Sequence, residues 1–286
     1  MIGAYVALTK PRVIELLLVT TVPAMILADG GLPNLGLIVA VLVGGALAAG
    51  GANTVNCWIE RDRDQLMKRT HHRPLATGAV EPVPALVFGL VLEVLAFALL
   101  WSTANLLSAS LALAAMLFYV FVYTIWLKPR SPQNIVIGGA AGAVPVLVGW
   151  AAVTGELAAP AWVLFALVFF WTPPHFWALA LRYRDDYAAA GIPMLPVVKG
   201  PEAATRQIFL YSIVVVATSL CLGLTTTVGL LYVVAAAVLG IMFIVGAWQL
   251  RRNPEPSRAI RFFGFSNLYL ASLFVVVAVD TLIRAA

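Results

Sequence analysis

The sequence predicts an all-α protein that crosses a membrane several times, and three observations support this prediction. Hydrophobic residues make up 62% of the 286 residues and charged residues only 11%, and the mean hydropathy is +0.96, well above the soluble range. The apolar residues form continuous runs rather than alternating with polar ones, which favours membrane helices over a β-barrel. Basic residues gather in alternate connections between these runs, as is typical of polytopic helical proteins.

Nine membrane spans are expected, because nine runs approach the roughly 20 apolar residues that a helix needs to cross the hydrocarbon core. In chain order they are 13–28, 35–58, 84–102, 104–126, 134–153, 159–181, 206–226, 228–250 and 263–283. No flexible linker or low-complexity segment separates them, so we expect residues 1–286 to form a single membrane domain.

The basic residues also predict the orientation of the chain. All but Arg284 of the 18 Lys and Arg residues fall on one side of the membrane if the N-terminus shares that side. The positive-inside rule makes this side the cytoplasm. We therefore expect a cytoplasmic N-terminus, an external C-terminus and an odd number of spans in a prokaryotic plasma membrane. The long cytoplasmic loops 59–83 and 182–205 are expected to form the mouth of an active site.

Charge and cysteine content exclude other classes of protein. The formal net charge is +5, but the charges lie in short loops beside membrane spans, so we expect no nucleic-acid partner. The two cysteines, Cys57 and Cys221, are far apart and indicate neither a disulfide framework nor a cysteine zinc site. Lys10 and Arg12 precede the first run without a small-residue cleavage pattern after it, so this run is expected to be a retained span.

The stretch 56-NCWIERDRDQLMKRTHHRPL-75 joins the second span to the first long loop. Asn56, Glu60 and Asp64 recur every four residues, so they share one face if the helix continues beyond its apolar part. An amide and two carboxylates form an all-oxygen ligand set that suits Mg²⁺ or Mn²⁺. Asp62 leaves this face if the helix persists and joins it if the helix ends early.

Cations follow these ligands directly in the sequence. Lys68, Arg69 and Arg73 are able to hold phosphate oxygens that a metal ion leaves free. Carboxylates beside cations at a membrane surface indicate a lipid-linked diphosphate as ligand. The alternative is a solvated charge cluster whose members pair with one another. His71 and His72 are expected to lie in an exposed loop.

A second polar stretch, 171-WTPPHFWALALRYRDDYAAAGIPMLPVVKG-200, contains the one histidine within a predicted span, His175. Pro173 and Pro174 are expected to break or kink the helix just before it. An ionisable residue within a membrane is a functional candidate, and haem ligation, proton transfer and substrate hydrogen bonding all stay open beside a purely structural role. Trp177 is expected to point to a different side from His175.

Further candidates lie at the same predicted membrane face. Asp185 and Asp186 begin the second acidic loop, and Lys199 follows a proline-rich turn. Tyr123 and Lys128 end the fourth span, where they are placed to contact phosphate. An aromatic anchor with a topology-setting lysine explains that pair equally well.

Four stretches resemble the UbiA-type intramembrane prenyltransferases, and most closely the branch of that superfamily that prenylates haem. They are KPRVIELLLVT, NCWIERDRDQLMKRTHHRPL, LKPRSPQNIVIGGAAGAVPVLVGW and WTPPHFWALALRYRDDYAAAGIPMLPVVKG. The resemblance runs from about residue 9 to 200. It implies nine helices around a central cavity, with the active site at the cytoplasmic end.

The resemblance also implies the positions of the two acidic motifs of the superfamily. The first corresponds to Asn56, Glu60 and Asp64, and the second to Asp186. Two departures stand out. Glu60 replaces the usual aspartate, which moves the metal by about one methylene length. Ala190 occupies a position that usually carries a carboxylate, so a second metal ion would have fewer protein ligands.

The implied activity is transfer of a farnesyl group from farnesyl diphosphate to a vinyl group of protohaem IX, with addition of water. The products are haem O and diphosphate, haem b is a substrate, and Mg²⁺ or Mn²⁺ is the cofactor. A downstream haem A synthase is an expected partner, together with the lipid bilayer. The expected metal ligands are Asn56, Glu60, Asp64, Asp185 and Asp186. The expected diphosphate ligands are Arg69, Arg73, Lys128 and Lys199. His175 and Asp64 are the expected catalytic residues, with Asp62, Tyr123 and Trp177 as further candidates.

Two rival functions remain at this point. A prenyltransferase of the same superfamily that acts on an aromatic quinone precursor would share the metal site and differ only in its acceptor. A proton-coupled transporter would use the mid-membrane carboxylate of Glu93, although most carboxylates lie at the predicted cytoplasmic face.

Overall fold

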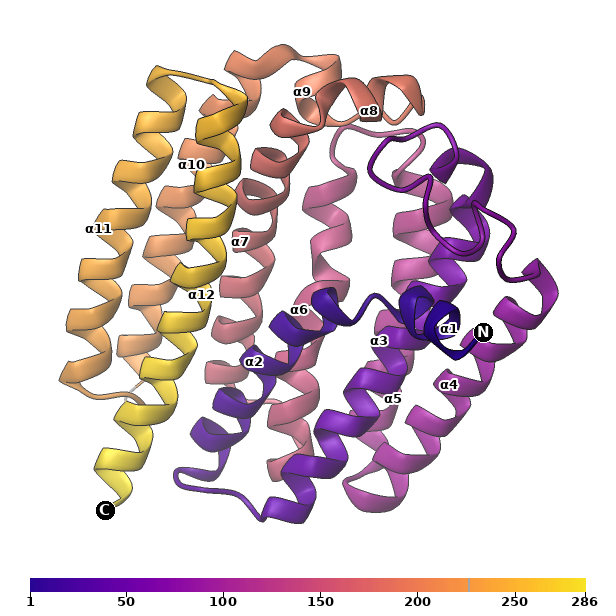
Figure 1. Cartoon of the computed structure of the whole chain (residues 1–286). Coiled ribbons are helices and arrows are strands. Elements are labelled where there is room, and N and C mark those ends of the chain that lie inside the picture. The colour runs from indigo at the N-terminus through magenta and orange to yellow at the C-terminus, as the bar shows by residue number, and fades with distance from the viewer. Residues whose placement is uncertain (226) are drawn as a thin grey trace.

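Helices account for all the regular structure in the computed structural model, which describes residues 1–225 and 227–286 except for the side chains of residues 12, 13 and 16–18. Most of the helices are long and run side by side through the molecule (Figure 1). Their bounds in chain order are α1 Ile2–Thr9, α2 Pro11–Asp29, α3 Leu35–Asp64, α4 Pro82–Thr103, α5 Leu106–Leu117, η1 Phe118–Leu127, α6 Asn134–Thr154, α7 Ala159–Arg182, α8 Arg184–Ala189, α9 Leu195–Val198, α10 Gly200–Cys221, η2 Leu222–Thr225, α11 Leu230–Arg252 and α12 Pro256–Ala285.

The predicted class is confirmed, because eight helical segments are long and apolar enough to cross a membrane among the described residues. They coincide with eight of the expected spans, and α2 covers the first one, at 13–28. The chain is therefore a multi-pass integral membrane protein. Nine spans and a cytoplasmic N-terminus stay predictions.

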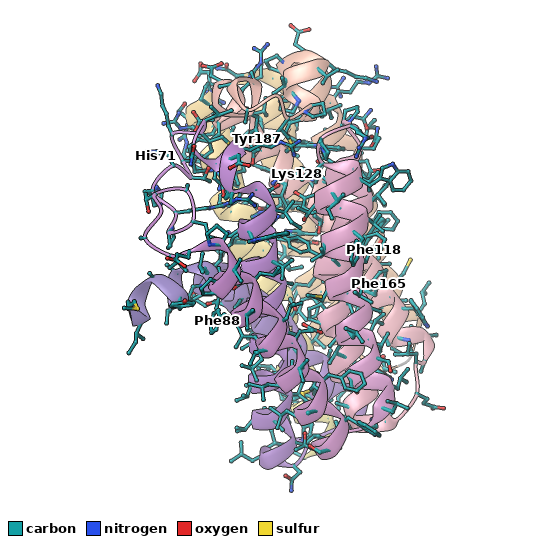
Figure 2. All side chains as sticks on the ribbon, turned by 90° about the vertical axis from the view of Figure 1, so that its right-hand side faces the viewer. His71, Phe88, Phe118, Lys128, Phe165 and Tyr187 are labelled. Atoms are coloured by element: carbon teal, nitrogen blue, oxygen red, sulfur yellow. The ribbon has the colours of Figure 1, made fainter. Side chains whose placement is uncertain are left out.

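The loop after α3 and the short helices α8 and α9 lie at one end of the bundle, and the C-terminus lies at the other (Figure 1). We call the end that holds the loop after α3, α8 and α9 the charged end. Figure 2 shows His71, Lys128 and Tyr187 at this end. The two long charged loops of the sequence thus meet at one end of the molecule, as expected for a shared site.

The close approach of α3 to α4 depends on small residues. A Cβ atom added at Gly51 would lie 2.7 Å from the carbonyl oxygen of Gly89, which is closer than real Cβ contacts allow. Membrane helices pack tightly where such small residues remove the side chain from the contact. This packing holds α3, which carries the predicted metal ligands, firmly against its neighbour.

Three local features differ from the expectations. The short helix α1 precedes Lys10, whose backbone is left-handed (φ 54°), and Pro11 then starts α2. The expected break at Pro173 and Pro174 is absent, since α7 continues through both prolines to Arg182. Packing against neighbouring helices lets a membrane helix keep its course despite the lost N–H donors.

The fourth expected span ends in a π-helix, η1, rather than a plain α-helix. Its wider turns are visible in two contacts, from Lys128 N to Tyr123 O at 2.8 Å and from Thr124 Oγ1 to Tyr119 O at 2.8 Å. Both contacts span five residues instead of four. π-Helical turns occur frequently at functional sites. Because the turns of η1 are wider, the side chains at the end of this span point in directions that differ from those in a regular α-helix.

Candidate active site

The last turns of α3 carry a buried polar face. Asn56, Glu60 and Asp64 are 1%, 3% and 3% exposed, so all three side chains face the interior. The side chain of Asp62 is 81% exposed and pairs with Arg61 at 3.8 Å. The helix therefore persists to Asp64, which brings the three predicted ligands onto one face and leaves Asp62 outside it.

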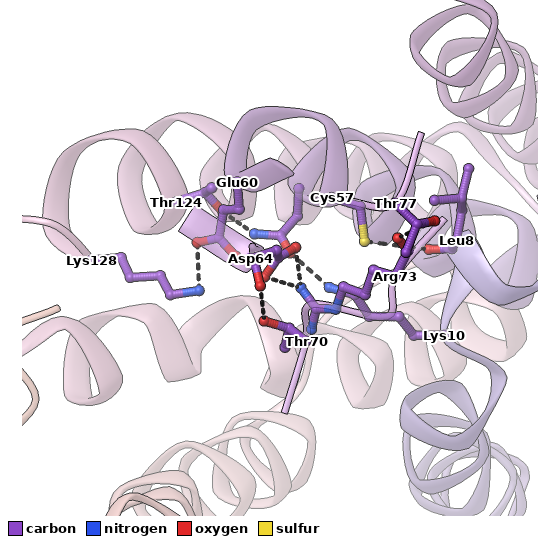
Figure 3. Close-up of polar contacts among 11 residues, drawn as sticks. Leu8, Lys10, Cys57, Glu60, Asp64, Thr70, Arg73, Thr77, Thr124 and Lys128 are labelled. Atoms are coloured by element: carbon purple, nitrogen blue, oxygen red, sulfur yellow. Dashed lines mark hydrogen bonds and ion pairs between the residues drawn. The ribbon is translucent and has the colours of Figure 1, made fainter. Parts of the chain in front are cut away.

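Two of these predicted ligands are carboxylates, and each is held by a cation from another segment (Figure 3). Arg73 Nη1 donates to Asp64 Oδ1 and Oδ2 at 2.8 and 2.7 Å, and Lys128 forms an ion pair with Glu60 Oε1. Burial is the largest single influence on the pKa of Lys128 and lowers it, but Glu60 together with Tyr123 and Tyr187 raises the pKa above its ordinary value. The pKa of Arg73 is also raised: burial lowers it, but Asp64, Cys57 and Glu60 together outweigh burial.

The third predicted ligand, Asn56, is held from two sides. Lys10 Nζ donates to Asn56 Oδ1 at 2.7 Å, and Asn56 Nδ2 donates to Thr124 Oγ1 in η1 at 3.1 Å. Burial lowers the pKa of Lys10 although the nearby Glu60 carboxylate acts in the opposite direction. The site thus gathers cations from the α1–α2 junction, the loop after α3 and the end of η1.

Sequence reasoning missed Lys10 as a site residue and read it only as a topology marker. A local signal was available, because the residue before a proline is biased away from the helical conformation, so the Lys-Pro pair favours a turn. A bond from Asn53 Nδ2 to Thr9 O at 2.9 Å ties this turn to α3. The left-handed backbone of Lys10 is thus held in place beside the polar face.

The second acidic region lies apart from this face. Asp185 is exposed, whereas Asp186 Oδ2 accepts from the backbone N–H of Arg69 at 3.1 Å. The Arg69 guanidinium lies 5.8 Å and 5.9 Å from the ring centres of Tyr183 and Tyr187. A cavity of about 440 Å³ opens here, lined by Lys68, Arg69, Arg182, Tyr183, Asp185 and Asp186.

The five expected metal ligands are therefore not assembled around one point. Within residues 1–225 and 227–286, no three Asp, Glu, His or Cys side chains converge as a metal centre. The three on α3 share one face, and Asp185 and Asp186 line the cavity between the loops. Lys199 is exposed at the start of α10.

The remaining candidates surround the polar face or lie deeper in the bundle. Lys128 Nζ lies 5.8 Å from the ring centre of Tyr123, which stacks on Tyr119 at 5.4 Å. Trp177 packs edge-on against Tyr211 of α10. The carboxylate of Glu93 is buried and has no hydrogen-bond partner among the described residues.

His175 is buried on the opposite side of α7 from Trp177, as expected. Its Nδ1 atom lies 2.6 Å from Ser266 Oγ of α12. The ring is stacked between Trp171 and Phe263, with both pairs of ring centres 4.2 Å apart. Ser266 and Phe263 follow His175 by about 90 residues, and the sequence carried no signal that paired them.

Comparison with known proteins places the chain among prenyltransferases. The model of the UbiA prenyltransferase family matches residues 17–273. The chain is 56% identical over 283 residues to a protoheme IX farnesyltransferase of Mycobacterium avium, covering 98% of the chain and 91% of that relative. It is 54% identical over 286 residues to the protein of the same name from Frankia alni, covering 99% of each.

Solved structures share the fold at lower sequence identity. A structure of digeranylgeranylglyceryl phosphate synthase superposes with a TM-score of 0.80 at 17% identity, covering 98% of each chain. A UbiA homolog from Archaeoglobus fulgidus bound to GPP and Mg²⁺ gives a TM-score of 0.67 at 20% identity, covering 96% of this chain and 99% of that one. At these identities the likeness establishes the arrangement of helices.

Proposed function

The chain belongs to the UbiA prenyltransferase family, and on this premise we propose that it transfers a farnesyl group from farnesyl diphosphate to a vinyl group of protohaem IX. The products are haem O and diphosphate. Relatives that are 54% to 56% identical over nearly the whole chain are named protoheme IX farnesyltransferase. The observation that carries the proposal is the buried oxygen face of α3, where every ligand is matched by a cation from another segment.

The oxygen face fits a magnesium ion by its chemistry. Asn56, Glu60 and Asp64 supply one amide oxygen and two carboxylates, and Mg²⁺ commonly completes such a partial set with water and substrate phosphates. A solved UbiA homolog binds GPP and Mg²⁺. When bound, the ion would neutralise charge that develops on the leaving diphosphate. The cations that now contact these oxygens have flexible side chains able to turn toward phosphate: Lys10, Arg73 and Lys128.

The reaction needs charge stabilisation more than a protein nucleophile. The allylic C–O bond breaks and its electron pair leaves with the diphosphate, which the cations hold. The π electrons of the haem vinyl group form the new C–C bond. Water adds to the carbon left electron-deficient and loses a proton, which gives the hydroxyethylfarnesyl group. The apolar helices around the site keep other water away from the allylic cation.

The second acidic region supports the same reaction from the loop side. Asp186 holds the backbone of Arg69, and two tyrosine rings lie beside its guanidinium. These contacts support the proposal that Arg69 holds the diphosphate beside α7 and α8. Asp185 and Lys199 are exposed, and their proposed roles are limited to weaker contacts with the metal-bound diphosphate.

A direct assay tests the donor and the acceptor together. Membranes that contain the chain are incubated with farnesyl diphosphate, Mg²⁺ and either haem or 4-hydroxybenzoate, and products are read by mass spectrometry. We expect a haem product that has gained a farnesyl group and a hydroxyl group, and its loss when EDTA removes the metal. Prenylated 4-hydroxybenzoate with unmodified haem would assign the enzyme to a quinone precursor instead. Membranes without the chain are the control.

A further inference from the structure

The cavity at the charged end is lined by two segments that lie far apart in the sequence. It measures about 440 Å³. The loop after α3 contributes Lys68 and Arg69, and the junction of α7 and α8 contributes Arg182, Tyr183 and two aspartates. The bond from the backbone N–H of Arg69 to Asp186 Oδ2 at 3.1 Å joins the two segments. Both segments therefore supply cations to the same cavity.

Two of these cations share one aromatic ring. The guanidinium groups of Arg69 and Arg182 lie 5.8 and 5.6 Å from the ring centre of Tyr183, within the range of a cation–π contact. A guanidinium group presents its N–H donors in a planar fork that matches the two oxygens of a carboxylate. The ring of Tyr183 thus places two carboxylate-binding groups at one cavity.

The basic side chains of this cavity are available to a ligand. Lys68 and Arg182 are exposed, and neither belongs to a salt bridge among the described residues. Arg69 Nε is buried and lacks a hydrogen-bond partner there, which is unfavourable unless an acceptor reaches it. With three cations and two carboxylates in its lining, the cavity is positively charged and favours an anion.

The diphosphate of the proposed donor has other cations to bind it. Three of them contact the oxygen face of α3: Lys10, Arg73 and Lys128. Arg69 is proposed to hold the same diphosphate, which leaves Lys68 and Arg182 for a second anionic ligand. The proposed acceptor provides one, because protohaem carries two propionate carboxylates on one edge of its ring and its vinyl groups on the other.

We infer that this cavity binds the propionate edge of the haem acceptor, through Arg182 and Lys68. The inference rests on the proposed function, because it takes protohaem as the acceptor. Contacts between a guanidinium and a carboxylate are charge-assisted and bidentate, and they fix the orientation of the ligand. The cavity receives the two carboxylate arms, and burial of the apolar ring favours the pose in which the vinyl edge turns toward the helices.

Titration of the purified full-length protein with haem, followed by absorbance, tests these contacts. We expect Arg182→Gln to weaken haem binding about 5- to 10-fold, because a charge-assisted contact with a carboxylate is lost. Arg182→Lys keeps the charge and should recover part of the loss. Adding Lys68→Gln to Arg182→Gln should bring the total loss to about 20-fold or more.

The matched control is Arg184→Gln. Arg184 is exposed two residues beyond Arg182 and lies outside the lining of the cavity, so the variant changes the net charge equally without touching the site. Its haem affinity should stay within about twofold of the wild type. A loss in Arg184→Gln equal to that in Arg182→Gln would show that only net charge matters and would overturn the inference.

A second ligand separates recognition of the carboxylates from a change in folding. The dimethyl ester of haem keeps the iron, the ring and the vinyl groups but has no charged propionates. We expect Arg182→Gln to bind this ester as well as the wild type does, because the contact that the variant removes is already absent. Equal losses for haem and for its ester in Arg182→Gln would overturn the inference.

The donor provides the remaining comparison. The affinity for farnesyl diphosphate with Mg²⁺, measured by calorimetry, should stay within about twofold in Arg182→Gln. A loss for farnesyl diphosphate with unchanged haem affinity would assign Arg182 to the diphosphate and overturn the inference.

Failure of the inference is distinguishable from failure of the proposed function. If the wild type binds and farnesylates haem and its dimethyl ester equally well, the inference alone is wrong. If the wild type farnesylates neither of them, the proposed function and the inference both fall.

Discussion

The two acidic regions of the molecule follow two long helices, yet the structure treats them differently. α3 continues as a helix to its last carboxylate, so Glu60 and Asp64 are buried beside cations. α7 ends at Arg182 and the chain turns into the short helix α8. Asp185 is therefore exposed and Asp186 only partly buried.

This difference shows that the local backbone structure decides whether a carboxylate is buried beside cations or exposed. A long helix that extends beyond its apolar part keeps a regular face toward the interior, whereas the short helix α8 leaves Asp185 exposed and Asp186 only partly buried. In the first region each predicted ligand contacts its own cation, and in the second Arg69 lies beside tyrosine rings. We therefore expect substitutions in the first region to be far more damaging.

Asp64→Asn should have the largest effect. It removes a proposed metal ligand and deprives Arg73 of its counter-ion, so the rate of farnesyl transfer should fall about 10²- to 10³-fold or more. Initial rates measured by mass spectrometry over a Mg²⁺ titration check this. Asp62→Asn is the matched control, since Asp62 is on the same helix but exposed, and it should keep its activity. A near-normal rate for Asp64→Asn would refute the metal face.

Lys128→Met should come next. A hydrogen bond to a charged group contributes about 1.5–3 kcal/mol, so losing this cation should lower kcat/KM for farnesyl diphosphate about 10- to 100-fold. The steady-state kinetics of the purified protein measure this change. Arg130 follows in the same segment and bonds only to backbone carbonyl groups of η1, so Arg130→Met should change kcat/KM less than threefold. Equal effects in the two variants would argue that net charge alone matters.

Lys10→Met tests the site residue that only the tertiary structure revealed. Lys10 contacts the amide of Asn56 rather than a carboxylate, so we expect a smaller loss, about 10-fold in kcat/KM. Lys10→Arg keeps the charge and should restore most of the activity. If Lys10→Met has wild-type kinetics, its contact with Asn56 only anchors α1 and α2, and thermal stability should fall instead.

The second region should give the smallest effects. Asp186→Asn weakens the contact that holds the Arg69 backbone, and we expect a loss of a few-fold in kcat/KM. Asp185→Asn changes an exposed side chain and should differ from the wild type by less than about twofold, as surface substitutions usually do. Loss of activity by Asp185→Asn on the scale of Asp64→Asn would show that both regions bind metal equally.

Much of this arrangement could be predicted because it depends on local regularities. The apolar runs predicted the positions of the helices, and the spacing of Asn56, Glu60 and Asp64 predicted their shared face. The π-helix η1 was not predicted, since a run of aromatic and aliphatic residues is compatible with either kind of turn. The sequence predicted a break or a kink at Pro173 and Pro174, and α7 does not break there, because the effect of proline on a membrane helix depends on the packing around it.

The sequence by itself determined the class of protein, the approximate helices, the oxygen-rich face of α3 and the likeness to a family. Only the tertiary structure decided which cation holds which oxygen and which serine orients His175. Periodicity describes neighbours on one helix, whereas Lys10 and Asn56 are 46 residues apart and His175 and Ser266 are 91 apart. Such contacts arise from how whole helices pack, and that packing depends on many side chains together.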